Sequence, residues 1–381
     1  MSERSHWDVF CRIVDNFGDA GVAFRLSRGL AREHGKRVRL WLDDLTVLAK
    51  LHPETDAGAD AQFVDGVEVR RWQPDAVHWR AEGIADVVLE TFGCDTPEPY
   101  VAAMAEAKPH PRWINLEYLS AEAWVEDSHA LPSPHPRFAP LTRHFFFPGF
   151  TGRTGGLLRE RGLLVRRDQF QSDLGARQAF WRSIGVEPPP PEALAVSLFG
   201  YAGAPYDGLL DALSRHPGPV WVVAPEGVAS AALAAWQGRA SGAKGGVRAY
   251  AIPFLPQDRY DELLWASDLN FVRGEDSFVR AQWAAKPFVW QPYPQADEAH
   301  RVKLDAFLSR YTAGMDRAHA AAVTGLWEAW NRGEGFATAW PAFDARREII
   351  AYATREWCHR LCTHADLATA LVDFADNVLV G

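Results

Sequence analysis

The chain has 381 residues, of which 48% are apolar, and its 40 basic and 49 acidic side chains give a net charge of −9. This composition excludes a disordered chain and argues against a broad nucleic-acid or anionic-membrane surface, while it permits a basic protein partner. No stretch approaches ~20 apolar residues, no secretory signal is recognised, and four cysteines do not make a disulfide framework. We therefore expect a cytoplasmic protein of two domains.

In the first half of the chain, short apolar runs alternate with helical patterns. Strands are predicted at 8–14, 38–42, 67–72, 85–89, 113–116 and 144–147, and helices at 21–33, 98–107 and 121–126. Strands that alternate with helices predict a parallel sheet covered on both faces.

A run of four prolines at 188–191 lies in the segment 186–191, and it cannot be helix interior or central strand. We interpret this segment as a linker, with a helix at 172–184 leading into it. Beyond it the alternation restarts, with strands at 195–199, 219–224, 247–252, 269–272 and 288–291 and helices between them. The prediction is a first Rossmann-like domain at 1–185, completed by helices at about 345–381, and a second at 192–344.

Two such domains leave a cleft between them, and open α/β sheets bind ligands outside the carboxyl ends of their strands. The first predicted strand runs into a turn in which Asp15 and Asp19 lie four residues apart. These carboxylates could cap the following helix, or they could face the cleft, orient a cationic group and accept a proton. The glycines of this turn do not fit the dinucleotide fingerprint G-x-G-x-x-G.

A second strand end, at 273–277, combines Arg273 and Ser277 with the N-terminus of a helix, which favours an anion such as phosphate. Glu275 and Asp276 would repel phosphate, so they need another role, such as binding sugar hydroxyls or a partner cation. The alternative is a capping box with an adjacent surface ion pair.

Aromatic residues follow two other strands of the second predicted domain. Phe254 precedes a proline turn that ends at Gln257, and Phe199 and Tyr201 flank a glycine. They could form the walls of a base-binding site, or they could be ordinary core.

A metal site is not expected. Cys358 and Cys362, with His359 and His364 nearby, lack a second ligand pair, so core cysteines are the favoured interpretation. The sequence also contains no Asp-x-Asp motif.

Five segments together resemble the EarP family of protein-arginine rhamnosyltransferases, and the resemblance spans nearly the whole chain. They are DNFGDAGV at 15–22, FFFPGFTGRTGGLLRE at 145–160, SLFGY at 197–201, PFLPQ at 253–257 and FVRGEDSFVRAQWA at 271–284. The resemblance implies a GT-B glycosyltransferase architecture, with two Rossmann-like domains facing across a cleft. It also implies an inverting transfer of L-rhamnose from dTDP-β-L-rhamnose to an arginine of elongation factor P, with no cofactor and no metal. That modification would activate the factor for rescue of ribosomes stalled at polyproline.

The resemblance also assigns roles by position. Asp15, Asp19 and Glu275 match the family's catalytic residues; we favour Asp19 as general base, Asp15 as orienting group, and Glu275 as a residue that shapes the donor and acceptor site. The donor-binding positions are matched by Phe17, Gly18, Tyr201, Phe254, Gln257, Arg273, Asp276 and Ser277.

Two other functions remain open. One is a different nucleotide-sugar enzyme of the same fold, such as an epimerase or an O-linking glycosyltransferase; the clustered acids, which suit a cationic acceptor, favour arginine instead. The other is a non-catalytic protein-binding module, against which the intact turn from Arg273 to Ser277 argues.

Overall fold

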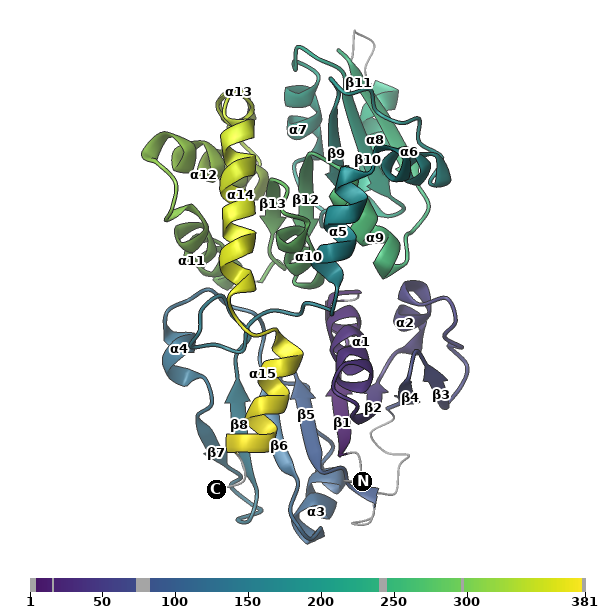
Figure 1. Cartoon of the computed structure of the whole chain (residues 1–381), viewed down its shortest axis with the longest axis vertical. Coiled ribbons are helices and arrows are strands. Elements are labelled where there is room, and N and C mark those ends of the chain that lie inside the picture. The colour runs from purple at the N-terminus through teal and green to yellow at the C-terminus, as the bar shows by residue number, and fades with distance from the viewer. Residues whose placement is uncertain (1–4, 16, 73–82, 240–244, 296–297, 379–381) are drawn as a thin grey trace. The chain divides into compact units, whose positions relative to one another are not determined.

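The computed structural model describes residues 5–15, 17–72, 83–239, 245–295 and 298–378. The chain forms two compact units, Met1–Arg161 with Leu361–Gly381, and Gly162–Arg360 (Figure 1). In the described part of the chain, no helix combines the length and the apolar character needed to cross a membrane.

The first unit is built on an eight-stranded sheet in the order β3-β4-β2-β1-β5-β6-β8-β7. Its strands are β1 (His6–Cys11), β2 (Arg37–Leu42), β3 (Ala61–Val64), β4 (Val67–Arg71), β5 (Val87–Thr91), β6 (Arg112–Leu116), β7 (Pro132–Pro134) and β8 (Thr142–Phe146). The six inner strands pair in parallel, and β3 and β7 close the edges in antiparallel pairs.

Helices join these strands in the manner of a doubly wound sheet. They are α1 (Phe17–Arg32), α2 (Leu45–Leu51), α3 (Glu98–Glu106), α4 (Trp124–Ser128) and, from the end of the chain, α15 (Leu367–Asp373) and the π-helical turn η2 (Phe374–Val378). The order of the inner strands reverses at β1, so the carboxyl end of β1 lies at a topological switch point.

The second unit contains a five-stranded sheet, all parallel, in the order β11-β10-β9-β12-β13. The strands are β9 (Leu194–Leu198), β10 (Val220–Pro225), β11 (Val247–Ile252), β12 (Leu269–Arg273) and β13 (Phe288–Gln291). Successive strands run outward from β9 in one direction and then from β12 in the other, so the switch point lies between β9 and β12. The general rule that such crossovers are right-handed predicts helices on both faces of this sheet.

The helices of this unit are α5 (Leu163–Ser172), α6 (Leu174–Ser183), α7 (Tyr206–Leu213), α8 (Val228–Arg239), α9 (Gln257–Ala266), α10 (Asp276–Ala284), α11 (Ala299–Thr312), α12 (Arg317–Arg332), α13 (Phe336–Asp344) and α14 (Arg347–Cys362). The last of these extends two residues past the limit of the unit.

The division between the units differs from the predicted linker. Residues 186–191 are irregular, as expected, but they lie inside the second unit, where Val186 is buried in the core beside Phe180 and Trp181 of α6. Helix α5 also belongs there, because Arg167 donates to the carbonyl oxygen of Trp283 at 2.8 Å. The boundary therefore falls at 161/162, and of the C-terminal helices only Leu361–Gly381 joins the first unit.

Most aromatic side chains serve packing. In the first unit Phe10 stacks on Trp41 with ring centroids 5.9 Å apart and lies 4.8 Å from Tyr100. In the second, Phe307 contacts the rings of both Tyr311 and Trp327 within 6 Å. The high aromatic content thus reflects two separate cores more than it reflects stacking faces for a ligand.

The end of the chain is held against the first unit by the loop after β8. Gly156 has φ 71°, and a Cβ there would lie 2.2 Å from the carbonyl oxygen of Ala365, so only glycine fits. The amide of Leu367 then donates to Leu157 at 3.0 Å, and α15 contacts α1 (Figure 1). This close approach accounts for Gly156, whereas at Gly155 a Cβ would lie 2.1 Å from the ring of Phe146.

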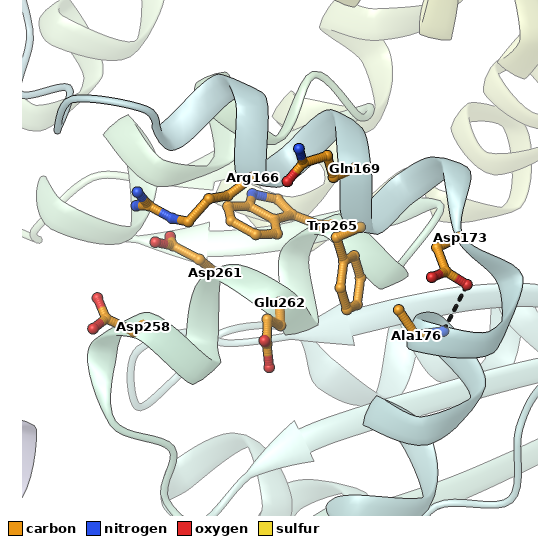
Figure 2. Close-up of a pocket in the computed structure, with 9 residues that line it drawn as sticks. Arg166, Gln169, Asp173, Ala176, Asp258, Asp261, Glu262 and Trp265 are labelled. Atoms are coloured by element: carbon orange, nitrogen blue, oxygen red, sulfur yellow. Dashed lines mark hydrogen bonds between the residues drawn. The ribbon is translucent and has the colours of Figure 1, made fainter.

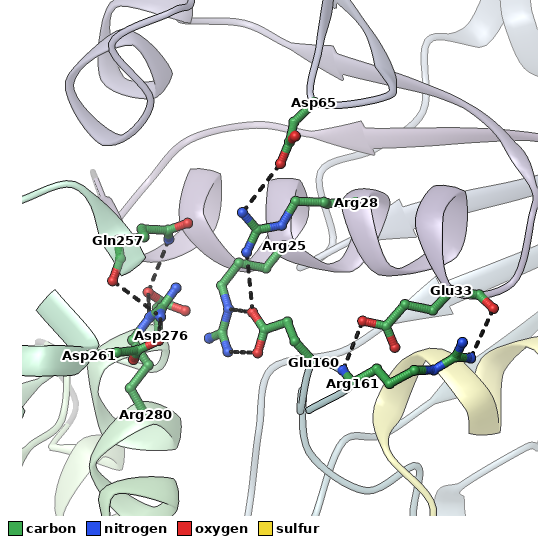
Figure 3. A network of polar contacts seen from close by, with 10 residues as sticks. All are labelled: Arg25, Arg28, Glu33, Asp65, Glu160, Arg161, Gln257, Asp261, Asp276 and Arg280. Carbon is green, nitrogen blue, oxygen red and sulfur yellow. Dashed lines mark hydrogen bonds and ion pairs between the residues drawn. The ribbon is translucent and has the colours of Figure 1, made fainter. Parts of the chain in front are cut away.

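Helix α1 carries a buried ion pair that fixes it to Glu160, near the point where the chain leaves the first unit. Arg25, whose side chain is fully buried, makes a bidentate pair with Glu160 at 2.7 and 2.9 Å (Figure 3). Arg28 lies between Glu160 and Asp65, and Arg32, more than half exposed, also pairs with Asp65.

Replacing Arg25 by methionine is expected to destabilise the first unit by about 3–5 kcal/mol, because the substitution leaves the Glu160 carboxylate without its bidentate partner. The matched control, Arg32→Met on the same helix, removes a mostly exposed pair and should cost less than about 1 kcal/mol. Urea unfolding of both variants checks this difference; equal losses would show that burial of the pair does not matter.

Candidate active site

The turn after β1 carries Asp15 and Asp19, the two aspartates predicted to be catalytic. It joins β1 to α1, which begins at Phe17, and the amide of Gly18 donates to the carbonyl oxygen of Asp15 at 2.7 Å. Because β1 is at the switch point of the sheet, this turn is where an open α/β sheet presents ligand-binding groups. The structure brings four predicted residues together here, namely Asp15, Phe17, Gly18 and Asp19.

Asp19 is 3% exposed and lies in the first helical turn of α1. From there its side chain stabilises the loop between β1 and α1. Its Oδ2 accepts hydrogen bonds from the amides of Val14 and Asp15, both at 2.8 Å. These amides precede the helix, so Asp19 is not an N-cap of the usual kind, which accepts from residues inside the helix. None of the described residues donates to Oδ1, which leaves that oxygen able to accept a proton or a donor from a substrate.

The environment of Asp19 makes it a stronger base than an exposed aspartate. Burial raises the pKa of its carboxyl group, and the nearby charge of Asp43 raises it further, while the two backbone hydrogen bonds oppose this shift. A carboxylate whose pKa is shifted toward neutrality transfers protons more effectively near neutral pH.

Asp43 was not among the predicted site residues. Its place at the end of β2, the strand next to β1, could have indicated it.

Asp15 and Gly18 depend on each other sterically. A Cβ on Gly18 would lie 2.9 Å from Oδ2 of Asp15, so the carboxylate lies directly over the glycine. A side chain at position 18 would force the carboxylate to move. The glycine therefore sets where Asp15 can place its charge.

Arg273 is the centre of the second predicted group, at the end of β12. Its guanidinium carbon lies 4.5 Å from the ring centre of Phe199 and 4.4 Å from that of Tyr201. The cation is therefore held between two aromatic rings that follow the neighbouring strand β9, across the switch point. No carboxylate in the described ranges forms an ion pair with it. A guanidinium stacked in this way keeps the N–H groups on its edge for an anionic ligand.

Phe199 and Tyr201 contact Arg273, and their part in a base-binding wall stays a prediction. Both rings contact the arginine, and Tyr201 is fixed further because its amide donates to Oε1 of Gln291 at 2.9 Å. Phe254 lies half-buried in the loop between β11 and α9, and its stacking on a base stays a prediction.

The turn between β12 and α10 is ordered by Ser277. Its Oγ accepts a hydrogen bond from the amide of Arg273 at 3.1 Å and donates to the carbonyl oxygen of the same residue. Glu275 is the residue preceding α10 and makes no side-chain cap, so the capping-box interpretation is wrong at this position. Its half-buried carboxylate therefore has no structural role as a helix cap.

Asp276 and Gln257 belong to a buried polar network. Oδ2 of Asp276 accepts from Nε2 of Gln257 at 3.1 Å and from Nε of Arg280 at 2.9 Å, and Arg280 also pairs with Asp261 at 2.8 Å (Figure 3). The network joins the start of α9 to the start of α10. It thereby fixes the loop of Phe254 relative to the turn of Arg273, two segments that were both predicted to bind the donor.

A cavity of about 550 Å³ opens between α5, α6 and α9 in the second unit (Figure 2). Phe170 and Trp265 form its apolar part, and its polar part contains Arg166 and the carboxylates of Asp173, Asp258, Asp261 and Glu262. Four carboxylates would repel a diphosphate, so this cavity is poorly suited to a nucleotide-sugar donor. The guanidinium of Arg273, which forms no ion pair with a carboxylate in the described ranges, suits an anion better.

No group of three or more His, Cys, Asp or Glu side chains that could hold a metal ion occurs in the part of the chain that the structure describes. Cys358 is buried and contacts a guanidinium nitrogen of Arg167 at 3.3 Å, and neither Cys358 nor Cys362 forms a disulfide. Cys358 is thus a core residue, as the sequence suggests.

Comparison with known proteins gives consistent matches. The family model for the elongation-factor P (EF-P) rhamnosyltransferase EarP matches residues 7–376. A protein-arginine rhamnosyltransferase of Pseudomonas putida is 46% identical over 99% of this chain and 100% of its own, and one of Pseudomonas aeruginosa is 45% identical over 97% and 98%.

Solved structures agree with these sequence matches. The structure that describes EarP-mediated arginine glycosylation of translation elongation factor EF-P is 36% identical, with a TM-score of 0.69 and coverage of 98% of this chain and 99% of that one. MurG of Acinetobacter baumannii, 13% identical with a TM-score of 0.51 over 98% and 99% of the two chains, shares the fold. The architecture is GT-B.

Proposed function

Because the chain belongs to the EarP family of elongation-factor P rhamnosyltransferases, we propose that it transfers L-rhamnose from dTDP-β-L-rhamnose to an arginine side chain of translation elongation factor P. The first unit binds the acceptor and the second unit binds the donor. Since the acceptor is a translation factor, the enzyme works in the cytoplasm, and the product is a factor activated for ribosomes stalled at polyproline.

The acceptor poses a specific chemical problem. A guanidinium has a pKa above ~12 and is a poor nucleophile while it is protonated. A pair of carboxylates can hold it through bidentate hydrogen bonds and remove a proton as it attacks. Asp15 and Asp19 lie on one turn, and Asp19 is buried with no donor to its Oδ1 among the described residues. Asp15 orients the guanidinium, and Asp19 takes the proton.

The transfer is a single displacement. A guanidinium nitrogen forms a bond to the anomeric carbon of rhamnose while the bond from that carbon to the diphosphate oxygen breaks. The electron pair of the broken bond leaves with dTDP, and the proton from the nitrogen passes to Asp19. Attack from the face opposite the leaving group inverts the anomeric configuration, so a β-linked donor gives an α-linked product.

The second unit stabilises the leaving group. Arg273 is held between Phe199 and Tyr201 and presents its free N–H groups to the diphosphate. The backbone amides at the start of α10, including that of Ser277, add hydrogen bonds to the charge that develops on the leaving oxygen, while the hydroxyl of Ser277 keeps the turn in place. Phe254 stacks on the base.

Glu275, Asp276 and Gln257 define the rest of the donor site. Glu275, which makes no helix cap, shapes the site where the sugar meets the acceptor. The network of Gln257 and Asp276 holds the base-binding loop in place. Phe17 and Gly18 complete the donor contacts from the turn of the first unit.

The stacked Arg273, which has no acidic partner among the described residues, is the observation that carries the donor half of this proposal. The whole proposal is tested by mass spectrometry of intact elongation factor P after incubation with the enzyme and dTDP-β-L-rhamnose, with UDP-N-acetylglucosamine as the comparison donor. We expect the mass of one deoxyhexose to be added with dTDP-rhamnose only. Addition of an N-acetylhexosamine, or no change with either donor, would favour another nucleotide-sugar enzyme of this fold.

Turnover is expected to persist in EDTA. The reason is that Arg273 and the N-terminus of α10 can supply the positive charge that a divalent cation supplies in metal-dependent glycosyltransferases. Initial rates with and without EDTA check this. A rate that falls on chelation and returns with magnesium or manganese would contradict it.

A further inference from the structure

Asp43 lies at the end of β2 and contacts the turn between β1 and α1, which carries the proposed acceptor-binding aspartates. It follows β2, and its Oδ1 accepts the amide hydrogen of Ile13 at 3.0 Å. The next two amides, of Val14 and Asp15, donate to Asp19. Three consecutive N–H groups of the turn are thus bound by two carboxylates, Asp43 after β2 and Asp19 in α1.

The charge on Asp43 is not required for this hydrogen bond, because a neutral amide oxygen can also accept it, although more weakly. The side chain is exposed, and none of the described lysines, arginines or histidines pairs with it. The next residue, Asp44, differs in this respect, because its carboxylate caps α2 through the amide of Thr46 at 2.8 Å. The negative charge of Asp43 therefore has no evident structural purpose.

We propose that Asp43 is a positioning residue for the general base: it holds the turn that carries the base and places a second negative charge beside Asp19. This inference rests on the proposed function, in which Asp19 accepts the proton of the arginine acceptor. Asp43 does not touch the substrate in this account. It acts through Asp19.

The surroundings of Asp19 show how the charge acts. The charge of Asp43 acts on the Asp19 carboxyl group, Asp15 contributes a backbone amide, and the thiol of Cys11 in β1 is also close enough to interact with it. Burial raises the pKa of the Cys11 thiol well above its usual range, so that group is neutral at physiological pH. Asp43 is a charge that raises the pKa of Asp19, so removing it should make Asp19 a weaker base that stays ionised at lower pH.

The test compares Asp43→Asn with Asp43→Ala and with the control Asp44→Asn. Asparagine at 43 keeps the acceptor for the Ile13 amide but removes the charge, whereas alanine removes both. Asparagine at 44 still caps α2. The measurements are the pH dependence of kcat/KM and the carbon-13 titration of the Asp19 carboxyl, assigned by its absence in Asp19→Asn.

In Asp43→Asn we expect the acid limb of the profile and the Asp19 titration both to move to lower pH, with unchanged dTDP affinity and thermal midpoint. Asp43→Ala should in addition lower kcat, and Asp44→Asn should match the parent. An unmoved Asp19 titration in Asp43→Asn, or an equal shift in Asp44→Asn, would overturn the inference. Because the titration needs no turnover, it separates this result from a failure of the proposed function itself.

Discussion

Replacing Asp19 by asparagine is expected to lower kcat for arginine rhamnosylation by about 10²–10⁴-fold, the usual contribution of a general base. Asparagine is nearly isosteric, and its amide oxygen can still accept the hydrogen bonds from Val14 and Asp15 that Oδ2 accepts in the parent chain. The turn should therefore keep its conformation. What the variant loses is the ability to take a proton from the guanidinium.

Calorimetry with dTDP and circular dichroism should show that the Asp19→Asn variant binds the nucleotide and folds as the parent does. Asp44→Asn, a substitution of the same kind at a residue that caps α2 and has no proposed role in transfer, is the matched control and should retain activity. Asp15→Asn should also be severely impaired, because one carboxylate cannot both orient and deprotonate a guanidinium. An Asp19→Asn variant that turns over at nearly the parent rate would show that this carboxylate only holds the turn.

Replacing Arg273 by alanine is expected to weaken dTDP binding by about 10–100-fold, because hydrogen bonds to charged groups contribute roughly 1.5–3 kcal/mol. The structure supports a large effect, since the guanidinium is already fixed between Phe199 and Tyr201 and loses little freedom when it binds an anion. Arg273→Lys keeps the charge but not the planar fork, so it should recover only part of the affinity.

Arg239→Ala is the matched control for this measurement. Arg239 lies in the same unit at the end of α8, where it is mostly exposed and pairs with Asp207 on the surface. Its removal should leave dTDP affinity unchanged.

Phe254→Ala should weaken dTDP binding through lost stacking on the base. Unchanged affinity in both Arg273→Ala and Phe254→Ala would remove the donor from this part of the second unit.

The regular elements were largely predictable because buried parallel strands are continuous apolar runs. β9 and β10, for example, begin within one residue of their predicted starts. The edges of the first sheet were not predictable in this way. β7 contains two prolines, and β3 exposes Phe63, so neither shows the apolar pattern of an inner strand. Edge strands need only one paired side, which allows such sequences.

The boundary between the units was wrong for a related reason. Prolines at 188–191 indicate where regular structure stops, but they carry no information about which core the flanking residues join. Phe180, Trp181 and Val186 all enter the core of the second unit, which only the tertiary packing reveals. A proline run is therefore a local signal and not a domain boundary in itself.

In the candidate site, the sequence indicated which turns matter but not how their side chains interact. Asp15 and Asp19 could be identified because they follow a strand in a glycine-bearing turn. The stacking of Arg273 between two rings depends on the adjacency of β9 and β12, whose residues are more than 70 positions apart in the chain. The contact of Asp43 with the Ile13 amide likewise depends on the pairing of β1 with β2.

The central claim, that the carboxylates of the first turn serve an arginine acceptor, is tested most directly by mapping the modified residue. Elongation factor P is treated with the enzyme and dTDP-β-L-rhamnose, digested and fragmented in a mass spectrometer, with the Asp19→Asn enzyme in parallel. The account predicts deoxyhexose on an arginine with the parent enzyme and almost none with the variant. Deoxyhexose on serine, threonine or asparagine, or equal labelling of the arginine by both enzymes, would contradict it.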